Sequence, residues 1–341
     1  MENYIDGTEE NFAVFDAIVK AKHVLMGHRK IVVSISGGSD SDIVIDICEK
    51  VKGDKKIQYI WFNTGIEYQA TKDHLDFLEK KYGVTITRLP PIKPIPNCVR
   101  EYGVPFLSKN VSEMLSRLQK YGFKFEDKPE EELLQEYPKC KRAVKWWCNT
   151  AGKTGKRFNI DYNKHLKDFL IANPPTIPIS NKCCIYGKKK PAKEYLKKSD
   201  EDLNVYGVRR SEGGTRATAY KECYTHAKRG SIDTFRPIFW LTDNDKKFYE
   251  KKNGVTHSAC YTKYGLKRTG CVGCPYGKDV EDELKSMKMF EPKLYKACMK
   301  IFGASYEYTK QYRQFCVAKK SEEKDNPDQI TMNDLFYDFA R

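Results

Sequence analysis

Hydrophobic positions along the first quarter of the chain alternate between a helical and a strand-like period. Apolar residues from Phe12 to Leu25 recur at helical spacing, and the β-branched run at 30–36 that follows is typical of a buried strand. The alternation continues with a helix at 41–51, a strand at 57–63, a helix at about 71–82 and a strand at 84–89. Strands that alternate with helices predict an α/β fold, a doubly wound and mainly parallel sheet with helices on both faces.

The middle of the chain departs from this alternation, because it is charged, aromatic and helical in pattern. Strand-like runs return at 203–210 and 235–242. The predicted organisation has four parts: an N-terminal half of the α/β domain at 1–109, a helical insertion at 110–175, a C-terminal half at 176–280 and a helical extension at 281–341. Trp146 and Trp147 in the insertion could stack on a base, but we expect buried packing, which is the commoner use of tryptophan.

Composition adds a charge to this picture. The 341 residues are 40% hydrophobic, enough for a sizeable core, and 61 lysines and arginines against 46 acidic residues give a net charge of +15. Such a balance indicates either an anionic partner (a nucleotide, a nucleic acid or an acidic carrier protein) or a solvated lysine-rich surface. The chain begins without the pattern of a signal peptide and contains no apolar run of membrane-spanning length, so we expect a cytoplasmic protein without a membrane partner.

The stretch SGGSDS, Ser36 to Ser41, joins the first strand to its helix. Gly37 and Gly38 let the backbone approach phosphate oxygens, and the serine hydroxyls and the amides at the start of the helix can donate to them. In an open parallel sheet this junction is where ligands bind. The pattern is neither GxGxxG nor a Walker A motif, and a tight strand-to-helix turn is the alternative interpretation.

Four of the twelve cysteines form two pairs, CC at Cys183 and Cys184 and CxxC at Cys271 and Cys274. Clustered cysteines in a cytosolic chain indicate metal or redox chemistry. Neighbouring thiolates converge poorly on one zinc ion, whereas the several irons of a 4Fe–4S cluster let them bind different corners. Structural zinc and buried free thiols are the alternatives, and the other eight cysteines are expected to pack in the core.

Several motifs carry a family resemblance. SGGSDS resembles the pyrophosphate loop (PP-loop) of the adenine nucleotide α-hydrolase-like superfamily, which includes ATP pyrophosphatases and sulfonucleotide reductases. FNTGIEYQAT at 62–71 and YGVPFLSK at 102–109 are similar to segments of the phosphoadenylyl sulfate (PAPS) reductase family, with Asn63 where Asp is usual. The order CC, a long gap and CxxC, with GVRRSEGGTR at 207–216 between them, resembles iron–sulfur reductases of adenylyl sulfate (APS).

The resemblance implies roles for individual residues. The expected nucleotide contacts are Ser36, Gly37, Gly38, Ser39, Asp40, Ser41, Asn63, Thr64 and Gly65. Arg209, Arg210 and Arg216 are the expected anion clamp, with surface ion pairs to Glu212 or Glu222 as the alternative. By resemblance Lys188 bridges the substrate and a 4Fe–4S cluster held by Cys183, Cys184, Cys271 and Cys274. Mg²⁺ would accompany ATP, with Asp40 as the nearest candidate carboxylate.

The resemblance leaves more than one function open. Sulfonucleotide reductases carry a nucleophilic cysteine in a C-terminal Glu-Cys-Gly segment, whereas the last cysteine here is Cys316, in RQFCVAKK. The chain is also similar to the ATP pyrophosphatase component of DNA phosphorothioation systems. We therefore expect a PAPS reductase-family enzyme that cleaves ATP at the α-phosphate in sulfur transfer. The alternatives are APS or PAPS reduction, with Cys316 or a partner's thiol as nucleophile, and a zinc-stapled nucleic-acid-binding protein.

Candidate partners follow from the same interpretation. They are an adenine nucleotide, a sulfur-carrier or cysteine desulfurase protein, and a nucleic acid as sulfur acceptor.

Overall fold

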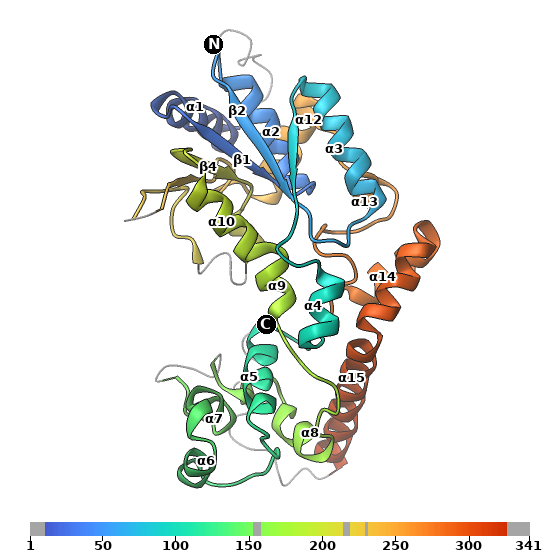
Figure 1. Ribbon diagram of the computed structural model, residues 1–341. Helices are drawn as coiled ribbons and strands as arrows, with labels where there is room; N and C mark the ends of the chain where they lie inside the picture. Colours follow the sequence, from blue (N-terminus) through green and yellow to red (C-terminus); the bar gives the residue numbers. More distant parts are fainter. Residues whose placement is uncertain (1–10, 153–157, 214–218, 229–230, 326–341) are drawn as a thin grey trace. The chain divides into compact units, whose positions relative to one another are not determined.

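The computed structural model describes residues 11–152, 158–213, 219–228 and 231–325 (Figure 1). These residues divide into two compact units. The first unit contains the chain up to Pro96 with 184–272 and 281–296, and the second contains 97–183, 273–280 and the chain from Ala297.

A six-stranded sheet organises the first unit. Its strands are β1 (Ile31–Ile35), β2 (Ile57–Phe62), β3 (Ile86–Leu89), β4 (Leu203–Tyr206), β5 (Tyr224–Thr225) and β6 (Asp233–Phe235). Their order is β3-β2-β1-β4-β6-β5, and all neighbours are parallel except β5, which pairs antiparallel with β6. With helices on both sides of this sheet, the predicted α/β fold is confirmed.

The helices outnumber the strands. The α-helices are α1 (Phe12–Gly27), α2 (Ser39–Val51), α3 (Gln69–Tyr82), α4 (Ile95–Tyr102), α5 (Lys109–Lys120), α6 (Glu130–Glu136), α7 (Lys141–Trp147), α8 (Leu166–Ala172), α9 (Lys182–Cys184), α10 (Lys190–Lys198), α12 (Asp243–Asn253), α13 (Ala259–Thr262), α14 (Val280–Phe290) and α15 (Pro292–Asp325). Short 3₁₀ turns occur at Pro138–Cys140, Ile160–Tyr162 and Arg210–Glu212, and a π-helix spans Ile185–Lys189. No helix in these described stretches carries an apolar segment that could cross a bilayer.

Strand β1 is buried on both faces, as its run of β-branched residues predicts. Ile31, Val33 and Ile35 pack in the core that α1, α2 and α3 also line, while Val32 between them is equally buried on the other face. On that other face the Ser34 hydroxyl donates to Asn204 of β4. The strand is therefore fixed in register between two layers of helices.

Two helices show how far hydrophobic spacing predicts burial. Ile43, Val44 and Ile47 of α2 are fully buried, as expected. In α1 the helix is confirmed, but its core face is a stripe of smaller residues, and Phe12 and Phe15 are exposed.

The strand expected at 235–242 is wrong in extent. Strand β6 ends at Phe235, because Pro237 has no N–H for a ladder and the chain turns there, with the Phe239 amide on the Arg236 carbonyl. The strand expected at 203–210 likewise ends at Tyr206. The sequence did not predict strand β5 or helix α12.

The second unit has a helical core of its own. Trp146 and Trp147 are fully buried in it, and the Trp147 indole N–H donates to the Glu126 carbonyl. Phe123 and Phe125 meet the Trp147 ring edge to face. The expected buried packing of both tryptophans is confirmed.

Of the eight cysteines expected in the core, five are buried: Cys48, Cys98, Cys140, Cys260 and Cys298. The other three, Cys148, Cys223 and Cys316, are only half-buried. Cys148 and Cys223 pack against the margins of the two cores and are only partly buried, where full burial was expected.

Candidate functional site

Three segments that the sequence singles out leave the sheet at the same edge. In the parallel register Ile35 of β1 lies beside Trp61 of β2, and Ser34 lies beside Tyr206 of β4. The chain therefore continues from neighbouring strand ends into the loop 36–41, the turn 63–65 and the segment 207–209. This carboxyl edge is where open α/β sheets bind ligands.

The glycines of the loop are required by its close surroundings. Gly37 has a φ of +71°, and a Cβ there would lie 2.7 Å from the methyl group of Thr71. Gly38 is the N-cap of α2, and its amide donates to the Ser36 and Ser41 hydroxyls at 3.2 and 3.1 Å. The loop is thus a compact turn whose serine side chains fold back onto its own backbone.

Two residues outside the motif close over the loop. The Ser39 amide donates to the Tyr261 hydroxyl at 3.2 Å, and that hydroxyl also accepts from the Thr269 amide. A Cβ on Gly38 would lie 3.1 Å from the Tyr261 hydroxyl and 3.0 Å from the Thr269 hydroxyl. Gly38 therefore accommodates Tyr261 and Thr269 as well as any ligand.

The turn after β2 is held by its own side chains. The side-chain Oδ1 of Asn63 accepts from the Gly65 amide at 2.7 Å, as an Asp oxygen would, so the departure from the family pattern keeps the turn. Thr64 donates through its amide and hydroxyl to the carboxylate of Glu67, a half-buried residue. Burial raises the pKa of Glu67, although Lys188 and Thr64 act in the opposite direction.

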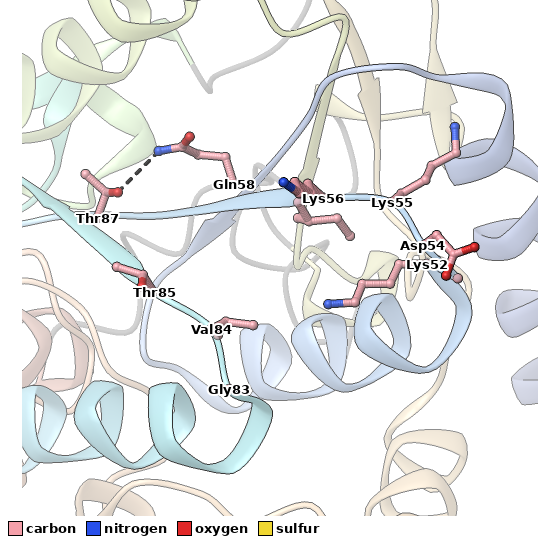
Figure 2. Close-up of a pocket in the computed structure, with 11 residues that line it drawn as sticks. Lys52, Asp54, Lys55, Lys56, Gln58, Gly83, Val84, Thr85 and Thr87 are labelled. Atoms are coloured by element: carbon pink, nitrogen blue, oxygen red, sulfur yellow. Dashed lines mark hydrogen bonds between the residues drawn. The ribbon is translucent and has the colours of Figure 1, made fainter.

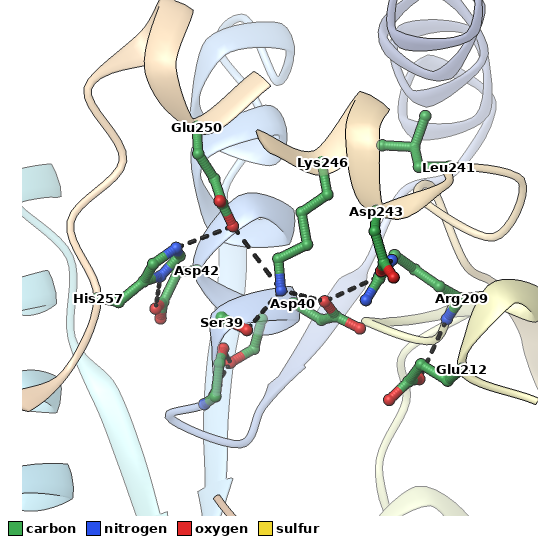
Figure 3. Close-up of polar contacts among 12 residues, drawn as sticks. Ser39, Asp40, Asp42, Arg209, Glu212, Leu241, Asp243, Lys246, Glu250 and His257 are labelled. Carbon is green, nitrogen blue, oxygen red and sulfur yellow. Dashed lines mark hydrogen bonds and ion pairs between the residues drawn. The ribbon is translucent and has the colours of Figure 1, made fainter. Parts of the chain in front are cut away.

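Asp40 sits between two cations (Figure 3). Its Oδ1 accepts from Lys246 Nζ at 2.8 Å and from Arg209 Nε at 3.0 Å. Arg209, only 7% exposed, also donates to Asp243 at 2.6 Å. Burial alone would lower the pKa of Arg209, but the ion pairs with Asp243 and Asp40 outweigh it and raise that pKa. Asp40 therefore anchors two basic side chains at the loop, whereas the sequence suggested it as a magnesium ligand.

The other arginines of the expected clamp differ from Arg209. The Arg210 guanidinium lies 5.4 Å from the centre of the Trp240 ring, a cation–π contact, and its amide donates to the Phe239 carbonyl. Arg216 lies outside the described residues. Of the two alternative carboxylates, Glu212 accepts from the Arg209 amide, and Glu222 contributes its backbone carbonyl to Arg236.

A buried charge network lies behind the loop on α2 (Figure 3). Asp42 is fully buried and bonds to His74 Nε2 at 2.9 Å and to His257 Nδ1 at 2.8 Å. The other ring nitrogen of His257 lies 2.9 Å from Glu250, so both its nitrogens face carboxylates. Burial by itself would lower the pKa of His257, but the bonds to Asp42 and Glu250 raise it to about 9. His257 is therefore an imidazolium at neutral pH.

This pKa gives a stability prediction. Because the folded pKa of His257 is raised from 6.5 to about 9, its contribution to stability is complete below pH 6.5 and is lost as the pH rises through about 9. For His257→Gln we expect a smaller free energy of unfolding than the parent's at pH 6, by at most about 3 kcal/mol, and a gap that narrows towards pH 9. Urea unfolding at several pH values measures this gap. His23→Gln, at an exposed position of α1, is the matched control, and a gap independent of pH would contradict the assignment.

Two of the four paired cysteines, Cys184 and Cys271, belong to the first unit. The charges of Cys271 and Cys184 interact, and Lys188 donates a hydrogen bond to Cys271. Burial raises the pKa of the Cys271 thiol, and Lys188 acts in the opposite direction. Lys188 belongs to a π-helix, a feature that often marks functional sites. Gly187, where the related reductases carry a basic residue, is buried, and a Cβ there would lie 3.1 Å from Ile95.

The metal assignment itself remains a prediction. Cys183 and Cys274 belong to the second unit. Within the described ranges, no three His, Cys, Asp or Glu side chains are grouped in a way that could hold a metal ion. What the structure offers towards a cluster is the chemistry of the donors: two thiols from distant segments, with a lysine beside them that favours the thiolate form.

A surface hollow of about 540 Å³ is lined by residues 52–58, which lead from α2 into β2, and by residues of the segment 83–87, which leads into β3 (Figure 2). These are the amino ends of the strands, opposite the loop. Lys52 is paired with Glu49, and Lys55 donates to the Met26 and His28 carbonyls, so two lysines lining the hollow are already engaged.

Several residues at the loop carry no signal in the sequence motifs. Lys246, Glu250 and His257 come from α12 and the segment after it, and Tyr261 comes from α13. A threonine followed three residues later by an aspartate, Thr242 and Asp245, is a capping box that could have revealed the start of α12. Nothing in the pattern indicates that this helix faces the loop.

Known proteins resemble the chain to different degrees. A model of the family described as phosphoadenosine phosphosulfate reductase domain matches residues 30–122 and 154–276, well over half of the chain. An uncharacterized protein of Methanocaldococcus jannaschii is 28% identical over 150 residues, which are 42% of this chain and 30% of that protein. The chain thus matches less than a third of that relative's length.

Solved structures align weakly. The PAPS reductase of Candida auris, in a phosphate complex, aligns with a TM-score of 0.39 and 14% identity over 77% of this chain and 96% of that chain. The U34-tRNA thiolase NcsA of Methanococcus maripaludis, with its 4Fe–4S cluster, aligns with a TM-score of 0.35 and 12% identity over 88% of this chain and 79% of that chain. Likenesses at these scores carry no information on activity.

Proposed function

The chain belongs to the phosphoadenosine phosphosulfate reductase domain family, and from this premise we propose that it is an enzyme that binds an adenine nucleotide at the loop 36–41. We further propose that it cleaves ATP at the α-phosphate as part of a sulfur-transfer reaction. The observation that carries the proposal is the convergence of Lys246 and Arg209 on Asp40, at the N-terminus of α2 and the carboxyl edge of the sheet. Helix N-termini and guanidinium groups both favour phosphate groups.

In the proposed reaction a nucleophilic atom of the acceptor attacks the α-phosphorus. The bond from that phosphorus to the oxygen shared with the β-phosphate breaks, and pyrophosphate leaves with the electron pair. The acceptor is then adenylated, and a sulfur nucleophile can displace AMP from it. Phosphoryl chemistry of this kind needs positioning and charge stabilisation more than covalent help. The loop amides, Arg209 and Lys246 would supply both, and Asn63, Thr64 and Gly65 would shape the neighbouring wall.

A 4Fe–4S cluster is part of the proposal. Cys183, Cys184, Cys271 and Cys274 would hold it, and the electrostatic interaction of Cys271 with Cys184 and Lys188 supports that donor set. Such a cluster would supply a site for binding sulfur or transferring electrons. Lys188, by its bond to Cys271, would keep the thiolate form of its neighbour.

A sulfonucleotide reductase is the second candidate. It needs a cysteine that attacks sulfur, and Cys316 is half-buried within helix α15, where its thiol donates weakly to the Lys164 carbonyl at 3.6 Å. A thiol in a regular helix lacks the mobile setting of a free terminal segment. A reductase reaction would therefore need a thiol from a partner protein. The family match alone supports this candidate. A sulfur-carrier protein or a nucleic acid as acceptor remains a sequence-based proposal.

Nucleotide-dependent stabilisation tests the proposal. We expect ATP with Mg²⁺ to raise the melting temperature of the full chain more than APS or PAPS does, because a ligand that binds only the folded state stabilises it by mass action. At a hundred times its Kd, ATP would add about 2.7 kcal/mol, which is a shift of several degrees. Stabilisation by PAPS with none by ATP would favour the reductase instead. GTP serves as the control for the adenine base.

A further inference from the structure

Lys246 reaches the loop from a different element. Its ammonium nitrogen lies 2.5 Å from the Ser39 hydroxyl and 2.8 Å from Asp40, the first two residues of α2 (Figure 3). The helix that carries it is firmly docked: Tyr249 of α12 is fully buried and donates to Asp46 at 2.7 Å. The position of the ammonium group is therefore set by packing, not by a chance surface rotamer.

The setting of this ammonium group is unfavourable for a cation on its own. A helix N-terminus carries partial positive charge, and Lys246 lies at that end of α2 with only 14% of its side chain exposed. Arg209 adds a second positive charge on the same Asp40 oxygen. Asp243 also pairs with Arg209 and Glu250 lies 3.7 Å from Lys246, so an incoming phosphate would share these two cations and the helix N-terminus with three carboxylates.

The hydrogen-bonding capacity of Lys246 is also incompletely used. An ammonium group has three donors, and Ser39 and Asp40 take two. The third donor faces Glu250 at 3.7 Å, an ion pair that is longer than a hydrogen bond. An incoming phosphate oxygen would take this donor from Glu250.

We propose that Lys246 binds the terminal diphosphate of a nucleoside triphosphate at the loop, and so distinguishes a triphosphate from a nucleotide that lacks this group. The proposal rests on the proposed function, because it takes the loop to be a nucleotide site. The SGGSDS motif has no lysine of its own, whereas phosphate loops of the Walker type carry one that reaches the β- and γ-phosphates. Lys246 would supply the equivalent charge from α12.

A purely structural role predicts something different. If Lys246 only braces Asp40 and Ser39, a neutral side chain that still donates hydrogen bonds should suffice. If its charge meets phosphate, the same replacement should weaken the binding of diphosphate-bearing ligands and spare those without that group. Lys246→Gln separates these cases, Lys246→Arg restores the charge, and Lys247→Met at the exposed neighbouring position is the control.

The experiment is calorimetric titration of each full-length variant with ATP, AMP and inorganic pyrophosphate, after circular dichroism has confirmed folding. For Lys246→Gln we expect ATP and pyrophosphate to bind about ten- to a hundredfold more weakly and AMP to bind as in the parent, since one charged hydrogen bond is lost. Lys246→Arg should recover most of the loss, and Lys247→Met should show none. If Lys246→Gln does not fold, Lys246→Arg and the salt dependence of pyrophosphate binding by the parent carry the test.

Two failures can be told apart. Equal weakening of ATP and AMP, or unchanged pyrophosphate binding in Lys246→Gln, would overturn the role of Lys246 while leaving the nucleotide site in place. A parent protein that binds pyrophosphate through Lys246 but no adenine nucleotide would overturn the proposed function and keep the diphosphate site.

Discussion

Arg209→Ala is expected to lower ATP-dependent pyrophosphate release by at least about a hundredfold, while Cys316→Ser leaves it unchanged. Arg209 is almost fully buried between Asp40 and Asp243, and its Nε holds the same Asp40 oxygen as Lys246. Without the guanidinium group, the loop loses a fixed positive charge at the place where charge would develop during departure of pyrophosphate. Pyrophosphate release, followed with a coupled phosphate assay, measures the effect.

The controls for this prediction separate charge from folding and one chemistry from the other. Arg142→Ala removes an exposed arginine of α7 and should have no effect, and thermal unfolding checks that Arg209→Ala remains folded. A sulfonucleotide reductase would behave in the opposite way: sulfite production from APS or PAPS would stop in Cys316→Ser. An unchanged rate of pyrophosphate release in Arg209→Ala would show that the guanidinium group has no role in the reaction.

The sequence predicted strand β1 well because this strand is buried on both faces. In the run Ile31–Ile35 four of the five residues are apolar, which is typical of a strand buried on both faces. SGGSDS follows this strand at a turn where the positive φ of Gly37 requires glycine. The strand at 235–242 was predicted too long, because the apolar residues after Pro237 form a buried turn that has the composition of a strand.

Of the two cations at the candidate site, the sequence predicted Arg209 but not Lys246. Arg209 lies at the end of a predicted strand and so could be assigned to the carboxyl edge. Lys246 lies in DNDKKFYEKKN, where it is one lysine among several. Its place is decided by the docking of Tyr249 against Asp46, a long-range contact that local pattern does not encode. The same holds for His257, whose charge depends on two carboxylates from α2 and α12.

The two cysteine motifs illustrate a different limit. Their spacing predicted a shared site that joins distant segments, and this stays a prediction, although the charges of Cys184 and Cys271 interact. Lys188 and Glu67 shift the pKa of Cys271 in opposite directions. Only the folded structure shows that they lie near it. Glu67 is positioned by its hydrogen bond from Thr64, which follows β2. Lys188 is positioned by a π-helix, which no hydrophobic period in the sequence predicts.

Loss of iron is the second effect expected to be large. Cys271→Ser or Cys184→Ser in the full chain, purified without oxygen, is expected to lower the iron content from about four per chain to near zero and to remove the visible absorption of the cluster. A serine hydroxyl is a far poorer ligand than a thiolate, and the two residues come from segments that the cluster would tie together. The melting temperature should fall as well, because the free energy of metal binding contributes to folding.

Cys48→Ala and Cys148→Ser test whether the loss is specific to the paired cysteines. Cys48 is fully buried in α2, so its replacement is expected to lower stability without removing iron; Cys148 is half-buried at the end of α7 and should change neither. This contrast matters because Cys271→Ser and Cys48→Ala can destabilise the protein to a similar extent for different reasons, a lost ligand and a cavity. Iron content and melting temperature must therefore be measured on the same preparations. Full iron content in Cys271→Ser, or a colourless parent protein loaded with zinc, would contradict the cluster assignment. These thiols would then have a structural role instead.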